Sequence, residues 1–475
     1  MDGLGGGLRQ LAREVTPVER AVPDDLWRRG RQRVRRRRTA AGALVAALTV
    51  TIAFVGSLVP QPTMTMPAGE SHAPAIPTSI DTPSRWLAGT DDTGPLGQLA
   101  VLGRAEGRDG DSAFGISAAT GEYRFLDLPG RVRDTSVALS PDGRQVAYWI
   151  TGLTRHQDFP PADGANTGGP VERPIAGVAV YNAEDGTVTR HLVESEYGLN
   201  TDASESDLVW LDDDSMLVSF SYFVSSNTSN RFAAHLWHVD DGDFRRVGSR
   251  DRWQSLSLLA DGTLAGQVSA PSTGDHVEFE PLTDRLRASG EGVRLPAGNY
   301  VDYSRFGDRV VVTGHQGSGG IQRVRTGTVG PDSRVAEVTP VGTIVIAELL
   351  GWRSDHSVLV AAVRGERYDD VGDLTEEGMG EDAGLGIAYE GDSTEPAWSL
   401  YEVDLVSQEV RRLGTADGLG QRLEVTTSLL AAPMVEGIRP PSPLDPRLRN
   451  AAIAAGVALL GWAVAVRVRS RRSRG

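Results

Sequence analysis

A strand-turn-strand unit recurs through the middle of this 475-residue chain. The clearest copy, VALSPDGRQVAY at residues 137–148, aligns without gaps with VWLDDDSMLVSF at residues 209–220. Apolar residues alternate on either side of each turn, which is the pattern of half-buried β-strands. In the first copy, Pro141 presets φ for the turn and Gly143 tolerates the positive φ that closes it. The unit therefore predicts a protein built from β-hairpins.

The spacing of the hairpins predicts how many sheets the chain forms. Hairpins begin near residues 137, 209, 258, 305 and 355, and the differences between successive starts are 72, 49, 47 and 50. Second hairpins, such as the one at 177–188, complete four-stranded sheets. A period of about 40 to 50 residues is that of a β-propeller blade, and an insertion accounts for the longest spacing. Strand-like runs at 99–102 and 123–128 add a blade before residue 137. We expect an all-β propeller of six or seven blades.

The turn Ser140-Pro-Asp-Gly143, followed by a hairpin of the form Y/L-x-V-D-x-x-x-G-x-V, resembles the WD-like β-propeller repeat of the TolB type. The resemblance covers about 350 residues, and this turn is its one near-perfect copy. It implies a blade and no particular chemistry. In closed propellers of this kind, a strand from one chain end completes a blade begun by the other, which removes a sheet edge. We expect the run at 422–432 to pair with the segment after Arg85.

Two uncharged runs flank the repeats. The first, residues 39–59, follows eight arginines between positions 28 and 38, and about twenty helical residues cross a hydrocarbon core of roughly 30 Å. The second, residues 450–466, precedes RVRSRRSRG. Arginines precede the first run and follow the second, and such clusters stay on the cytoplasmic side of a membrane. They therefore predict that both termini lie in the cytoplasm and the repeats lie outside it. A cleaved signal peptide is the alternative for the first run, with the nearest cleavage site at 71–75. A bacterial membrane protein with an extracytoplasmic propeller is the prediction.

Proline-rich segments separate the repeats from these runs. Proline fixes φ and removes a backbone donor, so both segments predict semi-rigid stalks. The expected organisation is a cytoplasmic Arg-rich arm (1–38), a first transmembrane helix (39–59), a stalk (60–84), the propeller (85–432), a second stalk (433–449), a second transmembrane helix (450–466) and a cytoplasmic basic tail (467–475).

Composition limits the chemistry and the partners. The chain has no cysteine, which excludes disulfides, thiolate metal sites and cysteine nucleophiles. The net charge is −15, the arm contributes +6 and the tail contributes +5, so the middle carries −15 − 6 − 5 = −26. Such a body repels nucleic acid and favours a neutral or cationic partner.

Candidate sites are few. The chain has no G-x-S-x-G, H-E-x-x-H, Walker lysine or dinucleotide motif. His235 and His238 are three apart in a predicted strand and face opposite ways. Asp109 to Asp111 and Asp240 to Asp243 fit hairpin turns better than calcium loops. We predict no catalytic, metal or cofactor site, and no cofactor; the ligand-binding residues stay unknown. Hairpin turns explain Asp142, Asp214, Asp261, Asp308 and Asp355, and a loop explains the glycine-rich residues 314–320. Asn227 begins a glycosylation sequon, to which we assign no function. Packing within blades explains Trp210, Trp237, Trp352 and Trp398.

Two insertions interrupt the blade period. One, residues 152–174, is rich in glycine and proline. The other, residues 366–395, has eleven Asp or Glu and one Arg, so we expect it to be solvated and to be a conceivable site for a cation or a basic peptide.

Three functions follow. The first is a non-enzymatic, membrane-anchored propeller that binds a ligand or protein in the cell envelope as a sensor or scaffold. In the second, residues 1–38 bind a cytoplasmic regulatory partner, since such arms resemble those of partners of extracytoplasmic-function sigma factors. The third is a propeller-fold hydrolase with carboxylates from distant blades. Recurrence of an Asp in every blade favours a turn requirement over an active site.

Overall fold

The computed structural model describes residues 73–133, 135–151, 175–193, 199–200, 207–223, 230–248, 253–268, 276–316, 323–330, 334–364, 398–416, 423–443 and isolated positions between 445 and 465. The chain divides into two units, Met66–Pro443 and the two chain ends together, Met1–Thr65 with Leu444–Gly475. All strands described below belong to the first unit.

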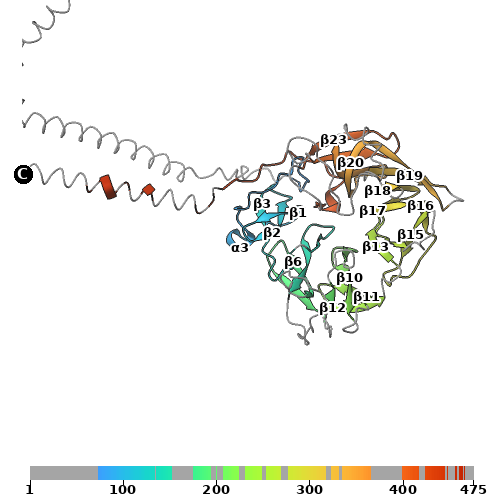
Figure 1. Cartoon of the computed structure of the whole chain (residues 1–475), viewed down its shortest axis with the longest axis horizontal. Coiled ribbons are helices and arrows are strands. Elements are labelled where there is room, and N and C mark those ends of the chain that lie inside the picture. The colour runs from blue at the N-terminus through green and yellow to red at the C-terminus, as the bar shows by residue number, and fades with distance from the viewer. Residues whose placement is uncertain are drawn as a thin grey trace, which may run out of the picture. The chain divides into compact units, whose positions relative to one another are not determined.

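Six antiparallel four-stranded blades surround a common axis (Figure 1). From the innermost strand outward, blade 1 contains β24 (Glu424–Val425), β1 (Leu99–Gly107), β2 (Gly110–Ser117) and β3 (Tyr123–Phe125). Blade 2 contains β4 (Val137–Leu139), β5 (Gln145–Thr151), β6 (Ile175–Asn182) and β7 (Val188–Leu192). Blade 3 contains β9 (Asp207–Trp210), β10 (Ser215–Phe223), β11 (Asn230–His238) and β12 (Asp243–Gly248).

The last three blades continue the ring. Blade 4 contains β13 (Trp253–Leu258), β14 (Leu264–Val268), β15 (His276–Leu282) and β16 (Val293–Pro296). Blade 5 contains β17 (Gly298–Phe306), β18 (Arg309–Gln316), β19 (Arg323–Val329) and the first part of β20 (Ala336–Trp352); blade 6 contains the rest of β20, β21 (Ser357–Arg364), β22 (Ser399–Asp404) and β23 (Val410–Thr415). Shorter elements are α3 (Thr90–Thr93), β8 (Leu199–Asn200), which pairs with β6 and β10, and the 3-10 turn η3 (Thr427–Leu429).

The all-β propeller prediction is confirmed, and the blade count is six rather than seven. The five hairpins expected near 137, 209, 258, 305 and 355 are the inner hairpins of blades 2 to 6. Alternation along β5 shows why the pattern was informative. Tyr148 packs into a cluster with residues of blade 1, whereas Trp149 packs into a cluster with residues of blade 3. Because both faces of the blade are covered by neighbours, its strands carry apolar side chains on both sides.

The ring closes as the sequence predicted. β24 pairs antiparallel with β1, so the C-terminal part of the propeller supplies the innermost strand of the first blade. Thr426 adds a backbone hydrogen bond, N–H to the Ala100 oxygen at 3.0 Å, and its hydroxyl donates to the oxygen of Leu99.

A second contact across the seam was not predicted. Residues 75–80, here called the leading segment, lie between β23 of blade 6 and residues 433–437, the trailing segment. Thr78 N–H donates to the Val435 oxygen at 2.8 Å, and Ile80 N–H donates to the Thr415 oxygen at 2.9 Å. The side chains of Ile76 and Ile80 are 1% and 0% exposed.

This contact moves the boundaries drawn from the sequence. The leading segment fell in the stalk at 60–84, and the trailing segment began the stalk at 433–449. Both belong to the folded body instead, which begins by Ala75 rather than at Arg85. Pro77 does not prevent this pairing, although proline has no N–H to donate. The hydrogen bonds come from the neighbouring residues instead, since the N–H groups of Thr78 and Ile80 are the donors.

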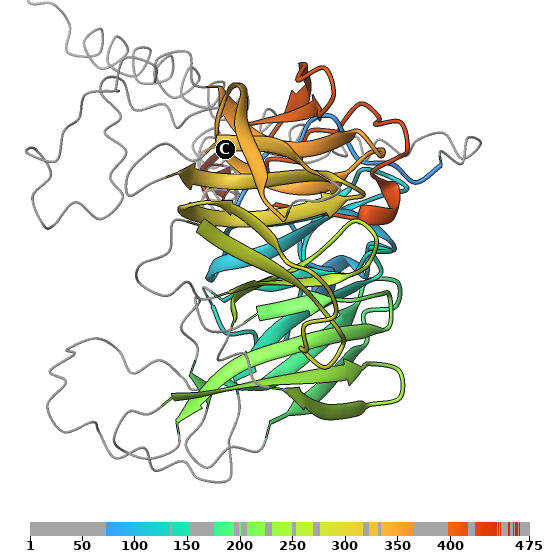
Figure 2. The ribbon, with the colours of Figure 1, turned by 90° about the vertical axis from the view of Figure 1, so that its right-hand side faces the viewer.

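The propeller has two unlike faces, seen edge-on in Figure 2. In blades 2 to 6 the turn between the first and second strands lies on one face, here called the turn face, and the third strand also ends on this face. Because successive strands are antiparallel, second strands end on the opposite face, here called the crossover face. The β1–β2 connection lies there, and so do the ends of the strands that flank residues 152–174 and 365–397. Both insertions themselves fall outside the described residues.

The predicted membrane segments are not tested. Residues 39–59 lie outside the described part of the chain, and only scattered positions of 450–466 are described. Within what is described, no helix combines the length and apolar character needed to cross a bilayer.

Ring closure leaves no room for a side chain at Gly143, in the turn between β4 and β5. Its φ is +74°, and its carbonyl accepts the N–H of Leu99 at 2.8 Å. A Cβ there would lie 2.2 Å from the Leu99 oxygen and 2.3 Å from the Thr426 hydroxyl. Gly262, in the corresponding turn of blade 4, has φ +79° with nothing within 4 Å.

We predict that Gly143→Ala destabilises the protein far more than Gly262→Ala. Both substitutions carry a left-handed backbone cost of about 1–2 kcal/mol. Only Gly143→Ala also pushes its new side chain against Leu99 and Thr426 at the seam. We therefore expect this variant to lose about 3 kcal/mol or more of the free energy of unfolding. Urea unfolding of the two variants measures the difference; equal losses would contradict this role of Gly143.

Candidate functional site

A cavity of about 300 Å³ opens beside blade 1. Three parts of the chain line it: residues 87–92, which follow the leading segment, the β1–β2 connection at 107–113, and the linker after β3 at 125–133. One wall is apolar and is made of buried side chains of Leu87, Ala113, Phe125, Leu126 and Leu128. The remaining lining is charged, with five carboxylates (Asp91, Asp92, Asp109, Asp111, Asp127) and three guanidinium groups (Arg108, Arg131, Arg133).

Asp111 organises the floor of this cavity. Its carboxylate accepts hydrogen bonds from Arg104 at 2.8 and 3.2 Å and from Arg131 at 2.8 Å. The side chain of Arg131 is only 8% exposed. Burial raises the pKa of the Asp111 carboxyl, but the two guanidinium groups together outweigh it and hold that pKa below its ordinary value. This buried cluster fixes the β1–β2 turn against the linker after β3.

The other charges of the cavity are less balanced. Asp92 pairs with Arg108 at 3.6 Å. Asp91, Asp109 and Asp127 form no ion pair with any residue that the structure describes, and neither does Arg133. The lining thus presents three carboxylates and one guanidinium group without an ionic partner among the described residues.

A second polar set lies on the innermost strands. Three carboxylates there, the axial carboxylates Asp302, Glu348 and Glu424, each accept the backbone N–H of the next blade's innermost strand or of the residue just before it. Asp302 Oδ2 accepts from Leu349 at 3.2 Å, Glu348 Oε2 from Leu423 at 3.2 Å, and Glu424 Oε2 from Leu139 at 2.5 Å. They tie blade 5 to blade 6, blade 6 to blade 1, and blade 1 to blade 2.

Asp302 also bonds within its own hairpin. Its Oδ2 also accepts the Thr313 hydroxyl at 2.6 Å. Burial raises the pKa of the Asp302 carboxyl above its ordinary value, although both hydrogen bonds act in the opposite direction. None of the three axial carboxylates was predicted from the sequence. The available signal was an acidic residue inside an apolar strand, as in NYVDY and IAELL.

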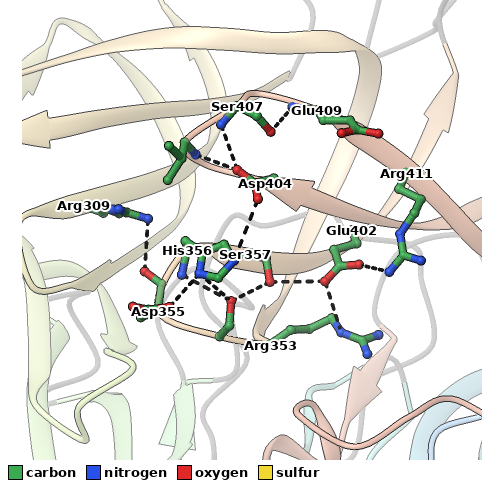
Figure 3. A network of polar contacts seen from close by, with 12 residues as sticks. Arg309, Arg353, Asp355, His356, Ser357, Glu402, Asp404, Ser407, Glu409 and Arg411 are labelled. Atoms are coloured by element: carbon green, nitrogen blue, oxygen red, sulfur yellow. Dashed lines mark hydrogen bonds and ion pairs between the residues drawn. The ribbon is translucent and has the colours of Figure 1, made fainter.

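Blade 6 brings a serine, a histidine and aspartates together on the turn face (Figure 3). Asp355 Oδ1 lies 2.6 Å from His356 Nδ1, and Ser354 Oγ lies 3.4 Å from the same nitrogen. In a catalytic triad the serine and the acid bind opposite ring nitrogens. Here Ser354 and Asp355 share Nδ1, and Asp404 lies 3.9 Å from Nε2, beyond hydrogen-bond distance. His356 therefore has no triad geometry in this arrangement.

The buried part of the same network is also structural. Ser357 donates to Glu402 at 3.2 Å, and Glu402 is paired with Arg411 and, at 3.6 Å, with Arg353. Burial raises the pKa of the Glu402 carboxyl, but the hydrogen bond from Arg411 and the charge of Arg353 more than offset this effect. The pKa of Glu402 therefore lies below its ordinary value. The network holds the turn between β20 and β21 against β22 and β23.

An aromatic stack joins blades 2 and 3. His235 lies between Phe220 and Phe244, with ring centroids 5.1 and 4.7 Å away, and His191 of β7 stacks on Phe244 at 3.8 Å. Burial lowers the pKa of His235 to about 4, with smaller contributions from Arg246 and His191, and burial also lowers the pKa of His191. Both rings are therefore neutral at pH 7.

Most sequence-based interpretations of single residues are confirmed. His235 and His238 face apart, since the former packs in the aromatic stack and the latter contacts Ser215 at 2.9 Å. Asp142 and Asp261 bond the N–H two residues ahead at 3.0 and 2.9 Å, as expected of turn residues. In blade 3 this role passes to Asp212, not Asp214.

Other expected features have mixed outcomes. Asp109 and Asp240 lie in the hairpin turns predicted for them, and Trp210, Trp237 and Trp398 are buried in blades. Trp352 donates to Ser304 at 2.8 Å. Among the described residues, no three His, Asp or Glu side chains gather as a metal-ligand set. Asn227, residues 317–320 and the acidic stretch 366–395 lie outside the described residues.

Comparisons with known proteins find distant structural likeness. No family model matches the chain, and no curated protein matches its sequence. An uncharacterized protein of Listeria monocytogenes EGD-e, lmo1340, is 10% identical with a TM-score of 0.38, over 72% of this chain and 85% of its own. An oligogalacturonate lyase from Vibrio parahaemolyticus is 10% identical with a TM-score of 0.38, over 72% and 81%. The tricorn protease is 11% identical with a TM-score of 0.39, over 69% and 30%. At these values, none of these activities transfers to this chain.

Removing the carboxylate of Asp302 should weaken the tie between blades 5 and 6. Asp302→Ala leaves two donors unpaired, so we expect a loss of about 2–4 kcal/mol in the free energy of unfolding. Asp302→Asn keeps an acceptor oxygen and should lose about half as much or less. Asp308→Ala, an exposed position in the same hairpin, is the control and should change stability by under about 0.5 kcal/mol. Similar losses in all three variants would contradict this role of Asp302.

Acid should destabilise the protein through His235. Its folded pKa of about 4 lies below the unfolded value near 6.5, so the unfolded state binds the proton first. Stability from this group is present above pH 6.5 and is lost as pH falls toward 4. We expect His235→Phe to be more stable than the parent by roughly 2 kcal/mol at pH 4.5, and similar to it at pH 7.5.

Unfolding curves between pH 4.5 and 7.5 test this expectation. His276→Phe, at an exposed position on β15, should leave the pH dependence unchanged. The assignment to His235 fails if the parent and His235→Phe lose stability in parallel on acidification.

Proposed function

We propose that this protein is a membrane-anchored, TolB-like β-propeller of the bacterial cell envelope. In this proposal the propeller lies outside the cytoplasm and both termini lie inside it. The propeller binds a ligand or a protein and acts as a sensor or scaffold rather than as an enzyme.

The observation that carries this proposal is the parallel bridge between Pro77 and Val435. It holds the leading and trailing segments side by side, so both connections to the chain ends start from one place on the propeller. Residues 60–74 and 438–449 then lead to the two predicted spans at 39–59 and 450–466. Two spans joined to neighbouring points can reach the same patch of bilayer, which supports a two-helix anchor.

The binding role is supported by a contrast between polar groups that stabilise the fold and charged groups that line the cavity. The axial carboxylates bond to backbone amides, and the polar network of blade 6 holds a turn. The cavity beside blade 1, by contrast, presents charged groups without ionic partners among the described residues. A body with a net charge of −26 in its sequence favours a neutral or cationic partner. Residues 1–38 lie outside the described part, and their binding to a cytoplasmic regulatory partner stays a prediction.

Cysteine labelling tests the proposed topology, because the native chain has no cysteine. Val406 is 64% exposed in the β22–β23 turn, so Val406→Cys should react with a membrane-impermeant maleimide in intact cells. Gly5→Cys, in the predicted cytoplasmic arm, should react only after permeabilisation. A Val406→Cys protein that stays unlabelled until lysis would contradict the extracytoplasmic placement.

A further inference from the structure

We propose that the cavity beside blade 1 binds a basic side chain, arginine or lysine, of a polypeptide ligand. This inference deepens the proposed function, on which it rests, by naming a site and a ligand class. It concerns only described residues, in the segments 87–92, 107–113 and 125–133.

The shape of the cavity suits one side chain. At about 300 Å³ it lies at the small end of the range for ligand sites. Leu87, Phe125 and Leu126, each under 10% exposed, form part of its apolar wall. Arginine and lysine combine a methylene stem, which buries well against such a wall, with a charged head that stays in a polar environment.

The charge of the cavity selects a cation. Five carboxylates and three guanidinium groups line the cavity, so carboxylates are in excess. Among them, Asp111 is paired with Arg131 and with Arg104, and Asp92 is paired with Arg108. Asp91, Asp109 and Asp127 remain, against Arg133, without ionic partners among the described residues. An anionic ligand would face an excess of carboxylates, whereas a guanidinium or ammonium group would reduce their mutual repulsion.

Two sides of the cavity are held in place by backbone and side-chain contacts. Residues 87–92 continue from the leading segment, and Gly89 is bridged to Phe125 at the end of β3. The guanidinium groups of Arg104 and Arg131 hold the opposite side through Asp111. A ligand in the cavity would therefore lie between blade 1 and residues 87–92, which follow the leading segment along the chain.

The test uses the full-length protein in detergent and three capped tripeptides: acetyl-Gly-Arg-Gly-amide, its citrulline analogue and its glutamate analogue. Citrulline has nearly the shape of arginine without the charge. Saturation-transfer NMR should show binding of the arginine peptide, with a dissociation constant between about 0.1 and a few millimolar. Its side-chain methylenes should receive the strongest saturation because they lie on the apolar wall.

Variants then locate the site. Asp109→Asn and Asp127→Asn should each weaken binding of the arginine peptide by up to about fivefold, and by tenfold or more together. Arg133→Ala should strengthen it, because it removes a guanidinium group of the lining that pairs with no carboxylate among the described residues. Asp240→Asn, the same change at an exposed position on blade 3, is the matched control and should have no effect.

Several outcomes would overturn the inference: no binding of the arginine peptide, equal binding of the citrulline or glutamate peptide, unchanged affinity in the Asp109→Asn, Asp127→Asn double variant, or weaker binding in Arg133→Ala. Thermal unfolding of each variant shows whether the fold is retained. These outcomes leave the membrane topology untouched, since the cysteine-labelling experiment decides that separately.

Discussion

The backbone hydrogen bonds across the seam between blades 6 and 1 are the interaction on which the propeller depends. Each blade of a propeller keeps an inner and an outer edge, and the blades on either side of the chain ends are stable only if the two ends supply the missing strands, since unpaired edge groups invite fraying or association. Here both sides of the seam are paired. β24 completes blade 1 from within, and the leading segment extends blade 6 from outside. Because β24 has only two residues, Thr426 and the trailing segment contribute a large part of this closure.

The axial carboxylates extend the same principle around the centre. Each carries a hydrogen bond from one blade to the next in the same rotational direction, across three successive blade junctions. A carboxylate is a strong acceptor and compensates a buried amide that has no ladder partner. The junction between blades 2 and 3 uses aromatic packing as well, with His235 held neutral in the stack. The blades are thus joined by polar bonds near the axis and by apolar packing between their faces.

The cavity beside blade 1 combines two parts of the chain. Its Asp111 cluster and most of its apolar wall belong to blade 1 and the linker after β3, whereas residues 87–92 add Leu87, Asp91 and Asp92 from the other side. The excess of carboxylates in its lining agrees in sign with the strongly negative body of the chain. Electrostatic attraction of a cationic partner and its binding in the cavity would then use charges of the same sign.

Local patterns in the sequence determined the blades. Alternating apolar residues around Asp-Gly turns specify hairpins through contacts a few residues apart, and regular spacing specifies their number to within one. The partner of residues 422–432 was also predictable, since a ring must close its edge.

Contacts between distant segments were decided only by the tertiary structure. Pro77 and its neighbours look like a stalk because composition does not show that Ile76 and Ile80 meet a buried seam. The axial carboxylates, the stacking of His191 on Phe244 and the three-part lining of the cavity depend on which blade lies next to which. Those side chains are brought together by ring geometry, and no pattern along the chain records such distances.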